Sequence, residues 1–169
     1  MKQNRLRKQI WMAMLIALGY VLSPFLRVPG MAPMQHFINV IAAVTTGPMG
    51  AFIVALIINI LRMLLMGITP LAITGSVFGA ALAGRLYVRF KKNWAAALGE
   101  WIGTGLIGSV LSYPVMHFIM GVGEIGWFTY VPGFIAGTTI GSIFGLLFIG
   151  IMQRFSFFRE MMNEVIHKS

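Results

Sequence analysis

Long apolar stretches alternate with short polar segments along the whole chain. Residues 10–26, 51–67, 71–87, 95–120 and 131–153 form five such stretches, each near the roughly 17–25 residues that cross a hydrocarbon core about 30 Å thick. A further apolar run, residues 36–46, is shorter and ends before Gly47-Pro48, a dipeptide typical of turns. The pattern predicts an all-α integral membrane protein. Residues 36–46 are either a short crossing of their own or the start of one kinked helix that continues to residue 67.

Lys and Arg decide between these alternatives, because cytoplasmic segments of membrane proteins carry an excess of basic residues. Five spans would place eight basic residues outside and four inside. Six spans leave only Arg27 outside and Arg62 within a span, and the other eleven lie inside: Lys2, Arg5, Arg7, Lys8, Arg85, Arg89, Lys91, Lys92, Arg154, Arg159 and Lys168. We therefore expect six transmembrane helices with cytoplasmic N- and C-termini, and a cytoplasmic turn at Gly47-Pro48.

The basic segment 1–9 and the apolar stretch after it also have the order of a signal peptide. No small-residue cleavage site of the A-x-A kind follows that stretch, and long apolar segments continue to residue 153. We expect a first membrane helix instead. Residues 1–169 then form a single six-helix transmembrane domain, with a basic cytoplasmic N-terminus (1–9) and a cytoplasmic C-terminal tail (154–169).

Composition excludes several classes of function. A content of 58% hydrophobic and 10% charged residues, with a mean hydropathy of +0.85, excludes a soluble globular domain. Four Glu, no Asp and no Cys leave too few ligands for metal clusters or thiolate sites, and we expect no metal and no cofactor. The net charge of +9 comes from clusters that flank the spans without interleaved aromatic residues, so we expect contact with the lipid bilayer and no binding of nucleic acid.

Small residues recur at intervals of four in several apolar stretches. Such rows let helix backbones approach closely in lipid, and packing inside the bundle is the expected role of those in the last three spans. The rows are Ala13 and Ala17 in the first span, Gly75, Gly79 and Ala83 in the fourth, Gly99 and Gly103 in the fifth, and Gly133, Gly137, Gly141 and Gly145 in the sixth.

Polar side chains within apolar stretches are candidates for a binding site, because each is costly in hydrocarbon unless it is paired or hydrated. Gln35, His36 and Asn39 share one face at the start of the second span, and Asn59 and Arg62 share one face of the third. Arg62 either binds a substrate or extends outward to the membrane surface. For Glu100 we expect a structural role near the cytoplasmic side, with a basic partner such as Arg85 or Lys91.

Aromatic residues are expected on the outer side of the membrane. Tyr113, His117, Trp127 and Tyr130 lie in or near a segment rich in glycine that could close over a site as a lid. They are suited to stack on a planar ligand, although aromatic residues also form belts at membrane interfaces.

Several sequence blocks resemble one family of membrane proteins. Six short spans, the Ala13 and Ala17 pair and the basic ends are similar to the substrate-binding S components of energy-coupling factor (ECF) transporters. More narrowly, the chain resembles the ThiW group over roughly residues 10 to 153. The blocks that carry this resemblance are PMQHFINV (33–40), GP (47–48), NILR (59–62), GSVFGA (75–80), GEWIGT (99–104) and LSYP (111–114).

The resemblance implies a prokaryotic plasma-membrane protein that takes up a thiamine precursor, hydroxyethylthiazole, and an ECF S-component-like bundle. It implies an ECF transmembrane scaffold subunit and two ABC-type ATPases as partners, docking at Ala13 and Ala17, and no enzymatic activity of the chain itself. The candidate substrate-binding residues are Gln35, His36, Asn39, Asn59, Arg62, Tyr113, His117 and Trp127.

Two other functions remain open at this point. The chain could be an S component for a different vitamin or heterocyclic precursor, such as one like a purine or pyrimidine. It could also be a small self-assembling membrane scaffold or pore. A membrane enzyme is the weakest reading, because the sequence contains no nucleophile with a base and no metal-binding constellation.

Overall fold

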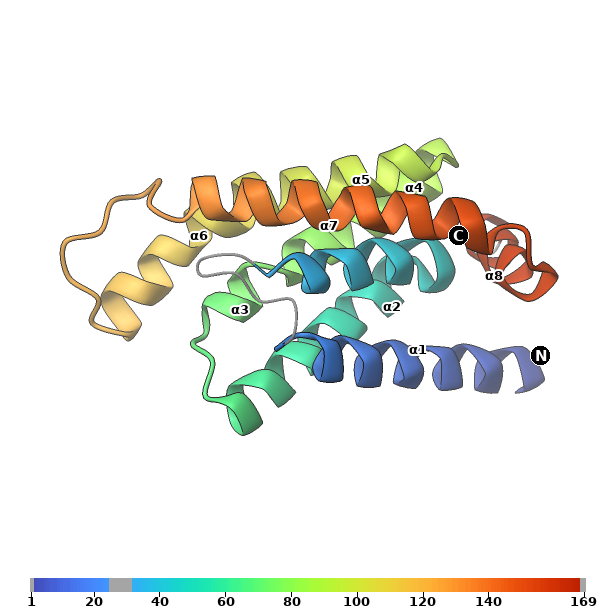
Figure 1. Cartoon of the computed structure of the whole chain (residues 1–169), viewed down its shortest axis with the longest axis horizontal. Helices are drawn as coiled ribbons and strands as arrows, with labels where there is room; N and C mark the ends of the chain where they lie inside the picture. The colour runs from blue at the N-terminus through green and yellow to red at the C-terminus, as the bar shows by residue number, and fades with distance from the viewer. Residues whose placement is uncertain (1, 25–31, 168–169) are drawn as a thin grey trace.

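The computed structural model describes residues 2–24 and 32–167, and every regular element in them is helical (Figure 1). Most of the helices lie alongside one another as an elongated bundle. The elements are α1 (Lys2–Leu22), α2 (Pro33–Met66), α3 (Leu71–Thr74), α4 (Val77–Phe90), α5 (Asn93–Glu100), the π-helical η1 (Trp101–Gly108), α6 (Ser109–Pro114), the π-helical η2 (Val115–Ile119), α7 (Val131–Met152) and α8 (Ser156–His167).

The predicted turn at Gly47-Pro48 is confirmed within α2. Gly47 has φ 76° and ψ −177°, which is not helical, so α2 consists of two helices. Figure 1 shows the chain reversing direction between them. The first half begins at Pro33, three residues before the apolar run starts, and this extension gives the short second helix its length.

Within residues 2–24 and 32–167, four helical stretches are long and apolar enough to cross a membrane: Pro33–Met66, Leu71–Phe90, Asn93–Ile119 and Val131–Met152. Because Pro33–Met66 reverses at Gly47, its two halves are separate helices, and with α1 the bundle has six. The helix α1 is not among the four, since its first two turns carry Lys2, Arg5, Arg7 and Lys8. The chain is therefore an all-α, multi-pass membrane protein.

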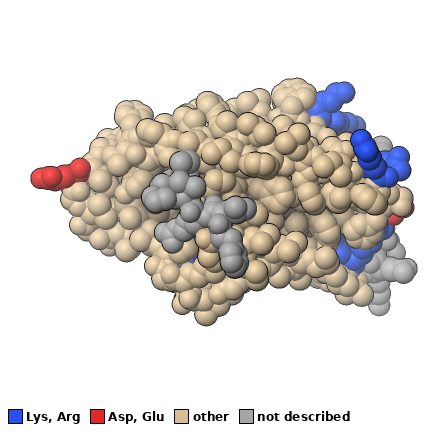
Figure 2. Space-filling view, in the orientation of Figure 1, with Lys and Arg blue, Asp and Glu red and all other residues tan. Residues whose placement is uncertain are grey.

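Basic residues gather at one end of the bundle. Arg7 on α1 forms an ion pair with Glu160 on α8, with Nη1 and Oε2 3.0 Å apart, and Lys91 ends α4. Figure 2 shows the Lys and Arg of one face of the molecule at this end, which also holds the N-terminus and α8 in Figure 1. The three basic clusters thus share one side. That this side is cytoplasmic remains a prediction from the distribution of charge.

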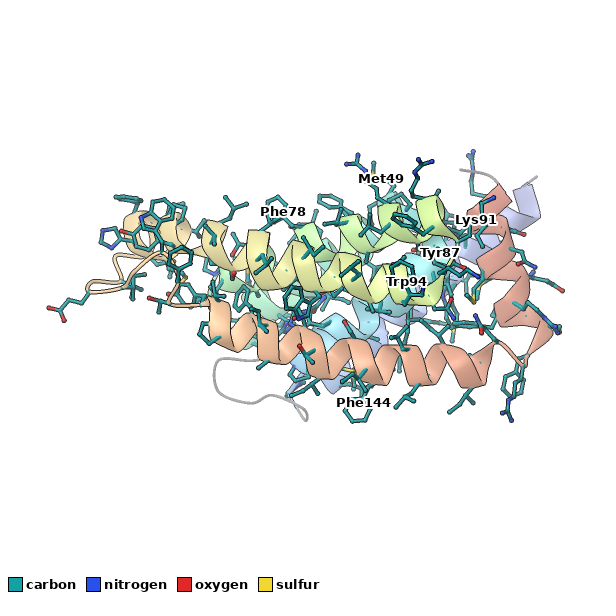
Figure 3. All side chains as sticks on the ribbon, turned by 90° about the horizontal axis from the view of Figure 1, so that it is seen from above. Met49, Phe78, Tyr87, Lys91, Trp94 and Phe144 are labelled. Atoms are coloured by element: carbon teal, nitrogen blue, oxygen red, sulfur yellow. The ribbon has the colours of Figure 1, made fainter. Side chains whose placement is uncertain are left out.

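The residues at 154–167 form more than a tail, because most of them belong to α8. This helix buries Phe158, Met161, Met162 and Val165 against the bundle, and Phe158 makes an edge contact with Trp11 of α1. Figure 3 shows α8 crossing the end of the bundle at which Lys91 lies. Helix α8 therefore closes the basic end of the bundle, over the turn at Gly47.

The glycine rows pack helices together, as predicted for the last three spans. A Cβ atom placed on Gly103 of η1 would lie 2.6 Å from Gly79 Cα on α4, and one on Gly141 of α7 would lie 2.7 Å from His36 Cβ on α2. Bulky residues such as Phe78 and Phe144 point outward instead (Figure 3). Small residues thus bring α4, η1, α7 and the first half of α2 into backbone contact.

We expect Gly47→Ala to destabilise the protein without removing any contact. The backbone at Gly47 has a positive φ with an extended ψ, a conformation that is essentially restricted to glycine and costs other residues about 1–3 kcal/mol. A Cβ atom there would meet Val165 Cγ1 at an ordinary 3.5 Å, so backbone strain is the only cost. Thermal unfolding of the purified protein measures the loss. Gly123→Ala, in an exposed loop with no atom within 4 Å of the new Cβ, is the control and should unfold like the wild type.

Candidate functional site

A group of polar side chains is buried in the centre of the bundle, among residues of α2, α4, α5 and η1. All are buried from solvent, and several have no exposed surface. We call this group the buried polar network, and it consists of Gln35, His36, Asn39, Asn59, Arg62, Ser76, Glu100 and Thr104. Five of these eight are predicted substrate-binding residues, and the structure brings all five together.

Glu100, at the end of α5, is the acceptor at one end of this network. It has no exposed surface. Its Oε1 accepts hydrogen bonds from Asn39 Nδ2 at 3.0 Å and Thr104 Oγ1 at 3.1 Å, and lies 2.8 Å from His36 Nδ1. The expectation that Glu100 pairs with Arg85 or Lys91 near the cytoplasmic side is therefore wrong. Its partners are the polar residues at the start of α2.

Arg62, on the second half of α2, is the donor at the other end. Only 3% of its surface is exposed, so the alternative in which it extends outward to the membrane surface is also wrong. Its Nη1 donates to Asn59 Oδ1 at 3.3 Å and to Gln35 Oε1 at 3.4 Å. An arginine at membrane depth needs such acceptors to offset its lost hydration.

The reversal of α2 and the break before α4 hold the network together. Asn39 lies on the first half of α2 and Asn59 on the second, and Ser76 occupies the non-helical position between α3 and α4. The Ser76 carbonyl accepts from Asn39 Nδ2 at 3.2 Å, and its hydroxyl accepts from Asn59 Nδ2. Gly79, one turn further along α4, leaves room for the carboxylate, because a Cβ there would lie 2.6 Å from Glu100 Oε2.

The three other predicted site residues form a second, aromatic group on α6, η2 and the following loop. The rings of Tyr113 and His117 stack with centroids 5.3 Å apart, and those of Tyr113 and Trp127 are 4.4 Å apart. His117 Nδ1 lies 3.0 Å from the carbonyl oxygen of Val122, which ties the ring to the loop. We call these three residues the aromatic group. They lie at the end of the molecule opposite the basic end (Figure 1).

Among the described residues, no hydrogen bond joins the aromatic group directly to the buried polar network. Thr74 on α3 and Ser112 on α6 share a hydrogen bond, with their hydroxyl oxygens 2.7 Å apart. In the sequence, Thr74 lies two residues before Ser76 of the network, and Ser112 directly precedes Tyr113 of the aromatic group. Trp127 is 52% exposed, so its ring is open to stack on a further partner. Partial burial raises the pKa of the Tyr130 phenol, just before α7.

One family model matches most of the chain, over residues 10–155, and describes the family as thiamine-precursor transporter protein (ThiW). The chain belongs to the ThiW family. No curated protein and no solved structure matches it. The matched residues include all of the buried polar network and the aromatic group, and they end before α8.

Membership in the ThiW family confirms the resemblance drawn from the sequence blocks. It establishes a transporter of a thiamine precursor and agrees with the expectation of a non-catalytic chain. The family supports a small-molecule cargo as a partner. The membrane-spanning helices support the lipid bilayer as a second partner.

Sequence reasoning missed Glu100, Ser76 and Thr104 as members of the network of this ThiW protein. Glu100 carried a usable signal, since it is an acid within an apolar stretch and such groups mark functional sites. Its place near the start of the apolar stretch 95–120, close in the sequence to Arg85 and Lys91, pointed to the cytoplasmic side instead. Ser76 and Thr104 carried no signal of this kind, because hydroxyl side chains are common in membrane helices and bond to their own backbone.

Proposed function

We propose that this protein is the substrate-binding S component of an ECF transporter that imports hydroxyethylthiazole across the plasma membrane of a prokaryote. The observation that carries the proposal is the buried polar network in a chain whose family transports thiamine precursors. A scaffold that only packs against other helices has no need of eight polar side chains in its centre.

The chemistry of the candidate residues suits this ligand. Hydroxyethylthiazole is small, planar and uncharged, with one ring nitrogen and one hydroxyl group. Gln35, His36 and Asn39 offer amide and imidazole groups at the start of α2, and the aromatic group offers rings for stacking on the thiazole. Arg62 and Asn59 complete the proposed binding set, because Arg62 donates to Gln35 and Asn59 accepts from Arg62.

The proposed docking surface for the ECF scaffold subunit is the face of α1 that carries Ala13 and Ala17. Both residues are exposed, whereas Leu15 and Gly19 of the same helix are buried against the bundle. Small residues that face outward do nothing for packing within this chain, and they would allow a partner helix to approach closely. The two ABC-type ATPases of the complex would supply the energy, on the side we assign to the cytoplasm.

Titration of the purified protein with hydroxyethylthiazole tests the proposed function. We expect saturable binding, weakened roughly 5- to 150-fold in His36→Ala and in Asn39→Ala, because each change removes a polar group proposed to pair with the ligand, at a cost of about 1–3 kcal/mol. Thr139→Val is the matched control. Its hydroxyl bonds to Trp101 at the exposed surface of α7, and its removal should leave the affinity unchanged.

Absence of binding by folded wild-type protein would refute the thiazole assignment. Competition with pyrimidines, purines and other vitamins then distinguishes an S component for another heterocycle from a protein that binds no solute.

A further inference from the structure

We propose that Arg62 and Glu100 are a compensating charge pair, coupled through two amide side chains, and that this pair restricts the binding site to uncharged ligands. This inference rests on the proposed function and assigns roles to Glu100 and Arg62 in selecting the charge of the substrate. Its evidence is the direction of the hydrogen bonds that connect the two residues.

The hydrogen bonds between Arg62 and Glu100 all run in one direction. Arg62 Nη1 donates to Gln35 Oε1 at 3.4 Å, Gln35 Nε2 donates to Asn39 Oδ1 at 3.1 Å, and Asn39 Nδ2 donates to Glu100 Oε1 at 3.0 Å. Each amide accepts on the side of the cation and donates on the side of the anion. Its dipole is therefore aligned with the field between the two charges, which stabilises both.

A second path from Arg62 starts with the same polarity and ends at Ser76. Arg62 donates to Asn59 Oδ1 at 3.3 Å, and Asn59 Nδ2 donates to the Ser76 hydroxyl. The Ser76 carbonyl accepts from Asn39, so the direction reverses at Ser76 and this path does not continue to Glu100. Asn59 is thus aligned with the charge of Arg62, and among the described residues the path through Gln35 and Asn39 joins the two charges.

His36 contributes a further donor to Glu100. A carboxylate can only accept hydrogen bonds, so the proton on the 2.8 Å contact between His36 Nδ1 and Glu100 Oε1 belongs to His36 Nδ1. The charges of Arg62 and Glu100 offset one another, and such a balanced pair is less costly at membrane depth than either charge alone.

This balance determines which ligands the site accepts. An uncharged azole alcohol leaves the charge balance of Arg62 and Glu100 unchanged. An N-methylated azolium brings a positive charge, and a phosphate ester brings negative charge, with no opposite charge to spare in the network. We expect the wild type to bind the neutral alcohol at least about 100-fold more tightly than either charged derivative.

Three variants test the pair through the charge of the ligand that each prefers. Glu100→Gln leaves a net positive network and should shift preference toward a carboxylate analogue, in which carboxymethyl replaces the hydroxyethyl group. Arg62→Gln leaves a net negative network and should shift preference toward the N-methylated azolium. The double variant restores neutrality and should regain the preference for the neutral alcohol. A merely structural role predicts weaker binding of all three ligands with no change in their order.

Thermal unfolding of the ligand-free variants is the second measurement. Each single variant leaves a buried charge without its counterpart, and we expect its Tm to fall by roughly 10 °C. The double variant should unfold at a higher temperature than the sum of the two single losses predicts. A double variant that can be purified when the single variants cannot would also support the pair.

Additive losses of Tm, or a double variant that loses more than the sum of the two single losses, would overturn the charge pair. The two proposals fail separately, because the unfolding measurements need no ligand. Wild-type protein that binds no azole while the Tm values of the variants are strongly coupled would refute the proposed function and leave the pair standing. If the wild type binds the azole and the variants prefer the charged and uncharged ligands in the same order as the wild type, the charge pair is refuted and the proposed function stands.

Discussion

Gly141→Leu is expected to prevent α7 from docking on the first half of α2. A side chain at this position meets backbone, because a Cβ would collide with the Pro33 carbonyl oxygen and lie 2.7 Å from His36 Cβ and 2.9 Å from Phe37 N. Helix backbone cannot move aside as a flexible side chain can, so the two helices must separate. In lipid, where dispersion packing holds helices together, we expect a loss of roughly 4 kcal/mol or more, beyond ordinary overpacking.

Size-exclusion chromatography and thermal unfolding of the purified variant measure this effect, and hydroxyethylthiazole binding should be lost as well because His36 is displaced. Gly150→Leu is the matched control on the same helix. Gly150 is exposed and no atom lies within 4 Å of its Cβ position, so this variant should fold and bind normally. If Gly141→Leu folds with unchanged stability, the close packing of α7 on α2 is wrong.

Ala17→Trp is expected to abolish uptake while leaving substrate binding intact. Ala17 is exposed on α1 together with Ala13, on the face opposite Leu15, which is buried in the core. An indole in this position disturbs nothing within the chain, but it would hold a partner helix away from the surface that small residues otherwise allow it to approach. Uptake of labelled hydroxyethylthiazole by cells that express the complete transporter should fall to background.

Binding of the ligand by the purified Ala17→Trp protein should equal that of the wild type, and the variant should fail to copurify with the scaffold subunit. Ile143→Trp provides the control, since Ile143 is 53% exposed on α7, away from the proposed docking face. It should transport normally. Normal transport by Ala17→Trp would rule out docking through this face, and a change in self-association alone would favour the scaffold hypothesis.

The helical framework follows from local features of the sequence. The length of the apolar runs gives the spans, and Gly47-Pro48 gives the reversal of α2, because glycine alone adopts its backbone conformation readily and proline cannot continue the preceding hydrogen bonds. Gly79, Gly103 and Gly141 mark helix faces in contact because a residue without a side chain lets a neighbouring backbone approach closely. Each of these signals is contained within one segment.

The position of Glu100 shows where such reasoning stops. Its expected place near the cytoplasmic side follows from the order of residues along one apolar stretch, but α5 continues into the π-helical η1, whose wider turns change the direction of side chains relative to a regular helix. The residues that bond to Glu100 come from α2 and η1. A sequence pattern predicts which residues share one face of a helix. It does not predict which other helix packs against that face.

The sequence alone determined the membrane class, the reversal at Gly47, the helix faces that pack, the ThiW family and five members of the buried network. Only the tertiary structure decided that Arg62 and Glu100 are joined through Gln35 and Asn39, that Tyr113, His117 and Trp127 form a separate group, and that α8 covers the basic end. The physical reason is that hydrophobicity and backbone preference act within a segment, whereas charge compensation in a membrane depends on which segments meet in space.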